Sequence, residues 1–354
     1  MPTVDKRELT TKQFIDEINL RLEKLNRKIS FNDLVNYLIL LNQNFITVVA
    51  GLPGVGKTSL VEKLAQAIGS FKNKRYLKIP VARGWTSSKD LIGYYNPLTK
   101  KYQSSKTDLY SFLKICERDV QNNTEVPSIV LLDEANLSPI EHYWSEFLSL
   151  ADLDYQRVIK TTDKESISFG DGVRFIATIN YDHTTEMLSD RLLSRAPIIK
   201  LNVADYTIEE TQEIASTFSE VYSMVQLNSH FNKNTQKDYF KGDIKNKFDS
   251  VVKTLQDDEG ALGQPIIIGM RKYKSVERFC AVAGNIMLDP NKFIALDYAI
   301  NQHILPLING RGDLFAKRLL DLREKLQGLP QSLKSVNKII QTGNDNFKNY
   351  KFFN

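Results

Sequence analysis

Hydrophobic positions along the chain change from helical spacing to short continuous runs after about residue 43. In residues 9–28 and again in 31–42, apolar residues recur at the spacing of amphipathic helices. Residues 45–50 are instead a β-branched run that ends at a glycine, which is typical of a buried strand in a parallel sheet. We therefore expect residues 1–43 to form an N-terminal helical extension in front of an α/β domain.

Four further apolar runs follow, and segments with helical spacing separate them. The runs cover residues 76–81, 129–132, 173–178 and 197–201, and the helical segments cover 58–68, 107–120 and 139–151. A Gly-Asp-Gly turn within residues 169–173 predicts a hairpin that leads into the fourth strand. Strands that alternate with helices form a parallel sheet covered on both faces. The expected fold over residues 44–203 is therefore a three-layer α/β domain.

Strand patterns end near residue 203, and the remaining chain shows helical spacing. Predicted helices cover residues 209–227, 272–287, 297–307 and 313–326. A Lys- and Asn-rich stretch at 228–258 is interpreted as a mobile insertion. The second domain, over residues 204–354, is therefore expected to be smaller and all-helical.

Composition narrows the class of protein only a little. The 354 residues are 42% hydrophobic and 25% charged, and a formal net charge of +5 permits contact with nucleic acid without indicating it. Cys116 and Cys280 lie in apolar helical patterns without a CxxC neighbour or a histidine cluster, which favours small core residues over a disulfide or metal site. The chain shows no signal-peptide core and no apolar run near the ~18 residues of a membrane span. A cytoplasmic protein is therefore expected.

A phosphate-binding motif follows the first predicted strand. Residues 51–58, GLPGVGKT, match the GxxxxGK[ST] pattern between a strand and a helix. Glycines let backbone N–H groups converge on phosphate oxygens, and the following helix adds the positive end of its dipole. Lys57 is expected to neutralise the β- and γ-phosphates and the Thr58 hydroxyl to ligate Mg²⁺. The predicted nucleotide-binding residues of this loop are Gly51, Pro53, Gly54, Val55, Gly56, Lys57, Thr58 and Ser59.

Polar side chains follow the next strands at their carboxyl ends, where parallel sheets gather ligands. Asp133 and Glu134 follow the run at 129–132, and we expect Asp133 to hold Mg²⁺ and Glu134 to orient and deprotonate the attacking water. Such a pair could also be a solvated helix cap, and the phosphate loop ~75 residues upstream favours the metal interpretation. Asn180 ends the next strand, where it could position the same water or simply terminate the strand.

Two arginines lie four residues apart before the last predicted strand. Arg191 and Arg195 share one helical face, from which either could reach the γ-phosphate bound by a neighbouring subunit. An arginine supplied in this way is worth roughly 10³–10⁵ in turnover. A surface ion pair with Asp190 or Glu186 would explain these arginines as well.

Together these motifs resemble the AAA+ superfamily, and more closely its branch of dynein-related and MoxR-like ATPases. Within that branch the chain is most similar to the McrB-like motor subunits of modified-cytosine restriction systems. The similarity is carried by DEANLSPIEHYWSEFLSL at 133–150, DLIGYYNP at 90–97 and AINQHILPLING at 299–310. It covers residues 44–326, so it implies an AAA+ α/β domain followed by a helical lid.

The resemblance implies a role for each polar residue. Asn180 would be sensor 1, Arg195 the arginine finger with Arg191 as second candidate, and Arg271 in IGMR sensor 2, unless it is a helix-start surface arginine. It also implies a homo-oligomeric ring, commonly a hexamer, that binds a nucleoside triphosphate with Mg²⁺. The sequence around Asn180 differs from the MNTAD stretch linked to GTP preference, so the base stays open between ATP and GTP.

Three functions fit these motifs. The first is the hydrolysing motor of an McrBC-like restriction or antiphage complex, with a separate nuclease subunit because this chain shows no nuclease signature. The second is a MoxR-like chaperone that remodels protein complexes, and the third is a nucleotide-dependent assembly scaffold. About 43 residues before the first strand are too few for a DNA-reading domain, so another subunit or a further part of the protein is expected to recognise the target.

An aromatic and basic segment lies after the second predicted strand. Trp85, Tyr94 and Tyr95 could face a pore or a partner, or could form a packed cluster. Contact with DNA would need basic side chains beside stacking aromatics, and these are available as Arg83, Lys89, Lys100 and Lys101.

Overall fold

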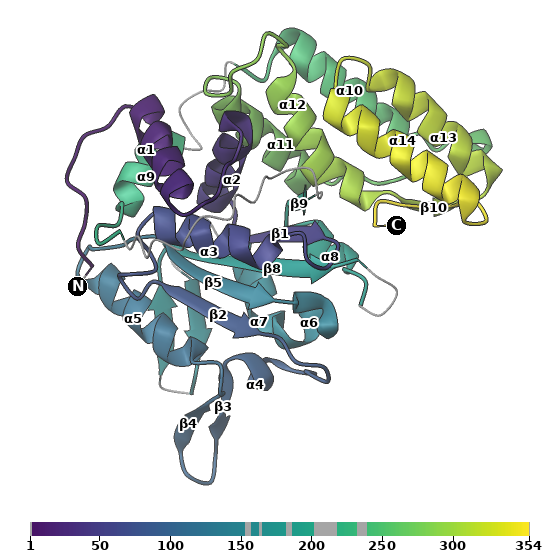
Figure 1. The fold of residues 1–354 in the computed structure, drawn as a ribbon. Coiled ribbons are helices and arrows are strands. Elements are labelled where there is room, and N and C mark those ends of the chain that lie inside the picture. The colour runs from purple at the N-terminus through teal and green to yellow at the C-terminus, as the bar shows by residue number, and fades with distance from the viewer. Residues whose placement is uncertain are drawn as a thin grey trace. The chain divides into compact units, whose positions relative to one another are not determined.

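The chain folds into two compact units in the computed structural model (Figure 1). The described residues are 2–152, 157–162, 165–181, 186–201, 218–231 and 239–353. The first unit, here the α/β unit, contains Met1–Ser30 and Asn44–His230, and the second, the helical unit, contains Phe31–Gln43 and Phe231–Asn354. This division differs from the expected one, because residues 31–43 were assigned to an N-terminal extension and instead belong to the helical unit.

A five-stranded parallel sheet forms the centre of the α/β unit. Its strand order is β2-β5-β8-β1-β9, and every neighbouring pair is parallel. The strands are β1 (Ile46–Gly51), β2 (Tyr76–Pro80), β5 (Ser128–Asp133), β8 (Val173–Asn180) and β9 (Ile198–Leu201). All residues of β1 are buried, as the continuous apolar run predicts for a strand between two others. The prediction of a parallel α/β domain is confirmed.

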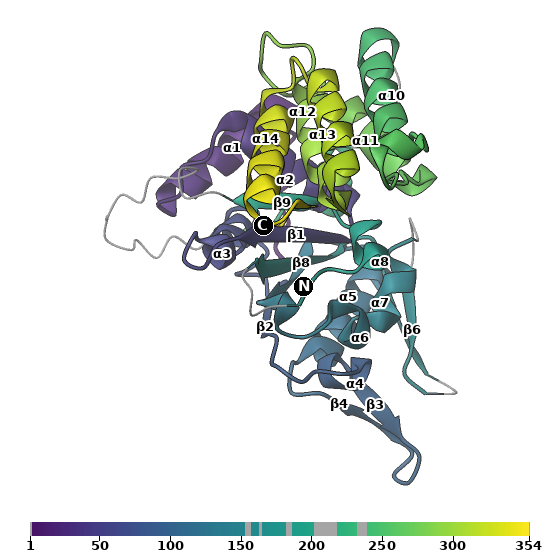
Figure 2. The same cartoon turned by 90° about the vertical axis from the view of Figure 1, so that its right-hand side faces the viewer.

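Helices cover both faces of this sheet (Figure 2). On one face, α3 (Lys57–Ala67) packs on β1, β5 and β8, and α1 (Thr11–Lys24) packs on α3. The opposite face carries α5 (Leu109–Gln121), α6 (Ile140–Tyr143) and α7 (Ser145–Leu150). The helix α9 (Met224–Phe231) joins the first layer, since the ring of His230 stacks on Phe14 of α1 at 4.7 Å. The three expected layers are therefore present.

An aromatic cluster fills the core between the sheet and α6–α7. The ring of Phe175 on β8 lies 5.3 Å from Phe45, 5.4 Å from Trp144 and 4.8 Å from Phe147. Such pairs contribute about 0.5–1.5 kcal/mol each beyond their burial. Trp144 has φ −100° and ψ 12°, so the helix predicted over residues 139–151 is broken there into α6 and α7.

Two antiparallel hairpins extend the α/β unit. The short helix α4 (Ser88–Leu91) leads into β3 (Gly93–Asn96), which pairs with β4 (Lys101–Ser104), and this hairpin projects from the unit in Figure 1. The second hairpin pairs β6 (Arg157–Lys160) with β7 (Ser166–Phe169). A hairpin was predicted here, but the Gly-Asp-Gly segment is not its turn. It joins β7 to β8, and β8 pairs with β1 and β5 instead.

The helical unit is built around α11 (Met270–Ala283). The helix α2 (Phe31–Gln43) packs on α11 and buries Leu34 and Leu38 completely, which is why it belongs to this unit. The other helices are α10 (Gly242–Gln256), α12 (Ile294–Ala299), α13 (Asp313–Lys325) and α14 (Pro330–Asp345). A π-helical turn at Ile300–Ile304 and a 3₁₀ turn at Leu305–Leu307 continue α12, and a further 3₁₀ turn covers Gly260–Leu262.

Two expectations for this unit were wrong in part. The stretch at 228–258, interpreted as a mobile insertion, contains α10, which packs on α13 and buries Ile244, Phe248 and Val251. The unit is also not entirely helical, because β10 (Asn309–Arg311) pairs with β11 (Asn349–Lys351).

Two predictions from composition can be compared with the structure. Cys116 and Cys280 are both buried and unpaired, as their apolar surroundings predict. Among the described residues, no helix combines the length and the apolarity that crossing a bilayer requires.

Candidate active site

The loop between β1 and α3 has the backbone of a phosphate cradle. Gly54 and Gly56 adopt φ values of 81° and 76°, in the left-handed region that favours glycine. A Cβ at Gly51 would lie 2.7 Å from the side chain of Val55, which is itself buried at 3% exposure. Gly56 then caps α3, an eleven-residue helix whose first N–H groups and dipole favour an anion.

Lys57 connects this loop to the end of β8. Its Nζ donates hydrogen bonds to the carbonyl oxygens of Gly51 at 3.0 Å and Leu52 at 2.9 Å, and to Asn180 Oδ1 at 2.6 Å. Gly51 and Asn180 are register partners on β1 and β8, so the parallel pairing brings the loop and the amide to the same edge. The lysine is therefore held in place by groups that an incoming phosphate would join or replace.

Asp133 at the end of β5 is surrounded by donors. Thr58 Oγ1 and Thr178 Oγ1 each donate to Asp133 Oδ1 at 2.7 Å, and Lys78 Nζ lies 3.3 Å from Oδ2. Burial raises the pKa of this carboxyl, but the two hydroxyls and the charge of Lys78 outweigh it, so the pKa lies below its ordinary value. The carboxylate is ionised at neutral pH.

The oxygens of Thr58 and Asp133 suit Mg²⁺, which binds proteins through one or two oxygen ligands and keeps several waters. Across the described residues, no cluster of three or more histidine, cysteine, aspartate or glutamate side chains could hold a metal by itself. Two oxygen ligands such as Thr58 Oγ1 and the Asp133 carboxylate leave positions on a Mg²⁺ ion for waters or phosphate oxygens.

Glu134 follows Asp133 in a strained conformation. It has φ 53° and ψ 44°, and its backbone N–H donates to Thr178 Oγ1 at 3.0 Å. A left-handed non-glycine residue costs of order 1–3 kcal/mol and persists only where its surroundings hold it. Glu134 is exposed, so its carboxylate is accessible to solvent water.

The sequence analysis did not identify three residues that support this cluster. Thr178 and Lys78 contact Asp133. The side chain of Asn136 donates to the carbonyl oxygen of Asn180 and accepts from its N–H. A signal was present for Thr178, since it is a polar residue within an apolar run that ends at the site. Only the pairing of β5 with β8 shows which carboxylate it reaches.

The two candidate finger arginines lie on or beside α8 (Asp190–Leu193). Arg191 is exposed, whereas Arg195 donates from Nη1 to the Arg191 carbonyl at 2.9 Å and from Nη2 to Asp152 Oδ2 at 2.8 Å. Arg195 thus has an ion-pair partner, but not Asp190 or Glu186 as the alternative interpretation proposed. Among the described residues, its hydrogen bonds and ion pair go to Arg191, Ser194 and Asp152 and not to the phosphate loop.

Ser59, Pro53 and Arg271 are the remaining predicted site residues. Ser59 lies in the first turn of α3, and Pro53 is exposed in the loop. Arg271 is exposed in the first turn of α11, in the helical unit. Its role as sensor 2 stays a prediction.

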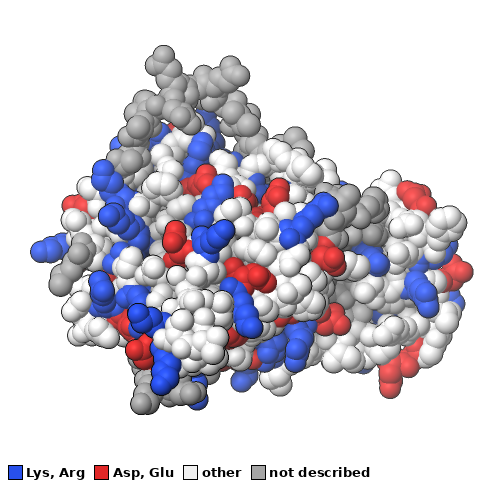
Figure 3. All heavy atoms as spheres, turned by 90° about the horizontal axis from the view of Figure 1, so that it is seen from below, with Lys and Arg blue, Asp and Glu red and all other residues white. Residues whose placement is uncertain are grey.

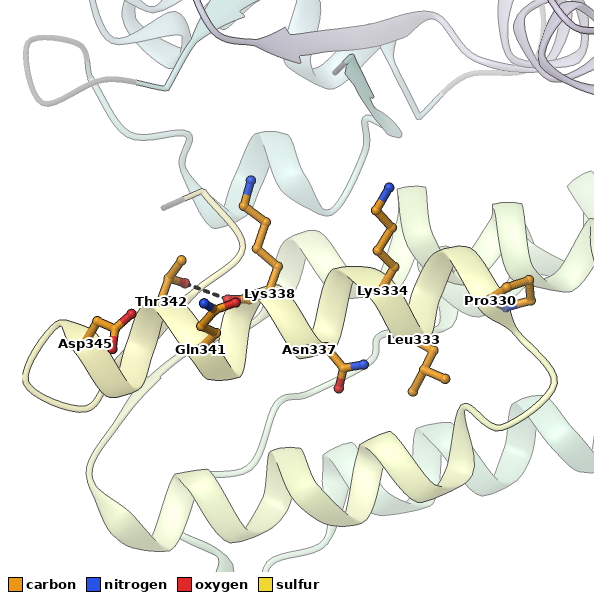
Figure 4. A pocket seen from close by; sticks show the side chains of 8 residues that line it. All are labelled: Pro330, Leu333, Lys334, Asn337, Lys338, Gln341, Thr342 and Asp345. Atoms are coloured by element: carbon orange, nitrogen blue, oxygen red, sulfur yellow. Dashed lines mark hydrogen bonds between the residues drawn. The ribbon is translucent and has the colours of Figure 1, made fainter. Parts of the chain in front are cut away.

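An open groove of about 710 Å³ runs along α14 in the helical unit. Figure 4 shows Lys334 and Lys338 projecting together from one side of this helix, while Leu333 and Asn337 point elsewhere. The two lysines are exposed side chains one turn apart. The charged side chains that line the groove are all exposed, whereas Lys57 of the phosphate loop is buried.

A phosphate loop after β1, an acidic pair after β5 and a polar residue ending β8, on a sheet of order β2-β5-β8-β1-β9, form the arrangement of the AAA+ fold. Residues 46–196 match the family model of the AAA domain of the dynein-related subfamily. The α/β unit therefore contains an AAA domain.

A second family model covers most of the helical unit. Residues 213–347 match a family model described as a domain of unknown function, DUF8727. Among solved structures, the chain is similar to the crystal structure of a "putative ATPase" from Cytophaga hutchinsonii. That similarity has 17% identity and a TM-score of 0.54 over 83% of this chain and 87% of that chain, so it shows the fold. No curated protein matches the chain.

Proposed function

We propose that the protein hydrolyses ATP or GTP as the motor subunit of an McrBC-like restriction or antiphage complex that works with a separate nuclease. The observation that supports hydrolysis is the continuous network from Lys57 to Asn180 and from Thr58 to Asp133, with Glu134 beside it. Phosphate binding, metal binding and water activation each have a residue in this network. ATP is the usual nucleotide of the superfamily, and GTP is the alternative.

Each residue within the chain has a distinct task in this proposal. The loop N–H groups and Lys57 bind the phosphates, and Thr58 with Asp133 holds Mg²⁺, which neutralises charge on the transferred phosphoryl group. Asn180 orients a water molecule, and Glu134 accepts its proton, which contributes roughly 10²–10⁴ in rate. The strained backbone of Glu134 is held by Thr178, so the base has a fixed starting position.

A neighbouring subunit supplies the missing positive charge. Within the described part of the chain, Arg195 makes no hydrogen bond to the phosphate loop, and Arg191 is exposed on α8. In a ring, commonly a hexamer, either arginine reaches the next subunit's γ-phosphate, and Arg195 is the preferred candidate. Arg195 then has to exchange its bond to Asp152 for one to phosphate. Arg271 contributes as sensor 2 from the helical unit.

The restriction assignment is supported by the three stretches that resemble McrB-like subunits. Residues 133–150 run from the acidic pair through α6 and α7, including Trp144 of the aromatic core. Residues 90–97 connect α4 to the β3–β4 hairpin, and residues 299–310 run from the end of α12 into β10. The first two stretches thus belong to the site and to the projecting hairpin.

The β3–β4 hairpin is the proposed DNA contact. Residues 91–107 contain Lys100, Lys101 and Lys106 and no acidic residue, and Lys89 Nζ lies 5.6 Å from the ring centroid of Tyr94. Tyr102 on β4 instead stacks on the half-buried ring of Tyr110 at 4.5 Å. Elsewhere on the face seen in Figure 3, basic and acidic side chains are interspersed. The hairpin therefore offers a local positive charge that suits a phosphodiester backbone.

Steady-state hydrolysis of ATP and GTP, with and without DNA, tests this proposal. We expect one nucleotide to be turned over faster and DNA to stimulate it. The Lys100→Ala/Lys101→Ala variant should lose the stimulation, whereas Lys12→Ala/Lys24→Ala, with the same charge change on exposed positions of α1, should retain it. Stimulation by a protein client without DNA would instead support a chaperone, and assembly with negligible turnover would support a scaffold.

A further inference from the structure

Asn136 connects two parts of the α/β unit that the proposed mechanism treats separately. It lies two residues after Glu134 in the 3₁₀ turn Ala135–Leu137 and is 4% exposed. Its side-chain Nδ2 donates to the carbonyl oxygens of Asn180 at 2.7 Å and Glu186 at 3.1 Å. Its Oδ1 accepts from the Asn180 N–H at 3.2 Å, and its carbonyl accepts from the Glu186 N–H at 2.9 Å.

Three of these hydrogen bonds use both N–H donors and the oxygen of the Asn136 side-chain amide, and the fourth uses the backbone carbonyl of Asn136. A side chain that must satisfy two carbonyls and one N–H at once has a single suitable orientation. The end of β8 and the segment at 186–189 are therefore held at fixed positions relative to one another. Aspartate at position 136 would lack both donors, and alanine would lack all three side-chain hydrogen bonds and keep only the backbone bond to Glu186.

Each end of this bridge leads to a proposed functional residue. On one side, Asn180 is the residue whose Oδ1 accepts from Lys57 in the phosphate loop. On the other side, Glu186 is followed by Ser189, which caps α8 by accepting from the Leu192 N–H. Of the candidate finger arginines, Arg191 lies on α8 and Arg195 lies two residues after its end. A continuous path of hydrogen bonds and short chain segments thus runs from Lys57 through Asn136 to α8.

We infer that Asn136 positions α8, and with it Arg195, according to the state of the phosphate loop in the same subunit. Because Arg195 serves the next subunit, Asn136 would link hydrolysis at neighbouring sites of the ring. This inference rests on the proposed function, since it requires an arginine that acts in trans. A misplacement of about 1 Å can cost about 10² in rate, so removal of the bridge should lower kcat about 10- to 100-fold.

Subunit mixing separates an effect on the neighbour from an effect on the subunit's own site. Asn136→Ala should lower kcat with less than about a threefold change in nucleotide affinity. Glu134→Gln subunits hydrolyse poorly but keep Asn136 and Arg195. An excess of them should therefore supply well-placed arginines and raise turnover per Asn136→Ala subunit several-fold. Arg195→Ala subunits should be rescued in the same way, but should not rescue Asn136→Ala.

Asn73 provides a matched control in the same unit. Its Nδ2 donates to the carbonyls of Gly69 at 2.9 Å and Ser219 at 2.9 Å, and its Oδ1 accepts from the Thr3 N–H at 2.8 Å. Asn73→Ala therefore removes an equivalent bridge beyond the far end of α3, and kcat should stay within about twofold of the wild type. Asn136→Asp keeps the size and the Oδ1 acceptor, so it replaces the alanine variant if that variant does not fold.

Several results would overturn the inference. A normal kcat in both Asn136 variants would show that the bridge does not control the site. A low kcat that Glu134→Gln subunits rescue for Arg195→Ala but not for Asn136→Ala would confine the role of Asn136 to its own subunit. If neither variant is rescued, the trans-acting arginine of the proposed function fails first, and the inference fails with it.

Discussion

Replacing Thr178 with valine removes one hydroxyl from the centre of the site and keeps the size of the side chain. Thr178 is 1% exposed, and its Oγ1 donates to Asp133 Oδ1 at 2.7 Å and accepts from the Glu134 N–H at 3.0 Å. The Thr178→Val variant loses both hydrogen bonds and places a methyl group against the Asp133 carboxylate. The change therefore affects the proposed metal ligand Asp133 and the proposed base Glu134 together.

The expected loss follows from the character of these two bonds. A hydrogen bond to a charged group contributes about 1.5–3 kcal/mol, and a neutral one about 0.5–1.5 kcal/mol. The bonds share one hydroxyl and are not additive, so we expect the free energy of unfolding to fall by about 2–3 kcal/mol. The Thr178 hydroxyl also helps to lower the pKa of Asp133, so that pKa should rise in the variant. Because Glu134 loses its backbone anchor, kcat should fall about tenfold or more.

Urea unfolding followed by tryptophan fluorescence measures the predicted fall in the free energy of unfolding. Both tryptophans, Trp85 and Trp144, belong to the α/β unit, so the signal reports the unfolding of that unit. Thr178→Ser is the control, because it keeps the hydroxyl and loses only a buried methyl group, at about 1 kcal/mol. If Thr178→Val is as stable as Thr178→Ser within about 0.5 kcal/mol, the hydroxyl does not hold Asp133 and Glu134 as argued.

Three further predictions concern other parts of the chain. Lys57→Ala should weaken nucleotide binding at least about tenfold in an equilibrium titration, because it removes the cation of the phosphate loop, and unchanged affinity would contradict that role. Arg318 is fully buried in the helical unit and donates to five backbone carbonyls, so Arg318→Met should lower the free energy of unfolding by about 3 kcal/mol or more, as followed by circular dichroism. A loss below about 1 kcal/mol would mean that those carbonyls find other partners. His303 is buried and has no hydrogen-bond partner among the described residues, and burial and two nearby cations hold its pKa well below the ordinary value. It stays neutral in the folded chain and binds a proton on unfolding, so stability should fall as the pH drops below about 6.5, by up to about 1.4 kcal/mol per pH unit. His303→Gln should reduce that slope, and an unchanged slope would assign it to other groups.

The sequence was informative where local pattern and topology agree. The apolar run of β1 and the glycines after it predict a strand followed by a phosphate loop without any tertiary information. Asp133 and Asn180 could be assigned to the same edge because carboxyl ends of parallel strands meet there. The structure brings both residues into contact with Lys57 or Thr58, while their catalytic roles stay proposals.

The supporting residues depend on register, which the sequence does not show. Thr178 contacts Asp133 only because β8 pairs with β5 so that Ala177 lies opposite Leu132. Asn136 binds Glu186 across 50 residues of sequence, and nothing local marks either residue as a partner. These contacts belong to tertiary structure, and pattern alone could not predict them.

The domain boundaries could not be predicted for a similar reason. The spacing of α2 predicts an amphipathic helix, but its partner α11 is more than 200 residues away in the chain. The helix α10 has apolar residues at helical spacing, yet its Lys- and Asn-rich surroundings favoured a mobile segment. The strands β10 and β11 are three residues long, too short for an alternating pattern.

Glu134 is the proposed base of a nucleotide-hydrolysing site, and the Glu134→Gln variant tests this role when its hydrolysis is measured beside its nucleotide affinity. We expect the nucleotide affinity to stay within a few-fold of the wild type, because Lys57, Thr58 and Asp133 are untouched, while turnover falls roughly 10²–10⁴-fold. Near-normal hydrolysis in a variant that binds nucleotide normally would contradict it.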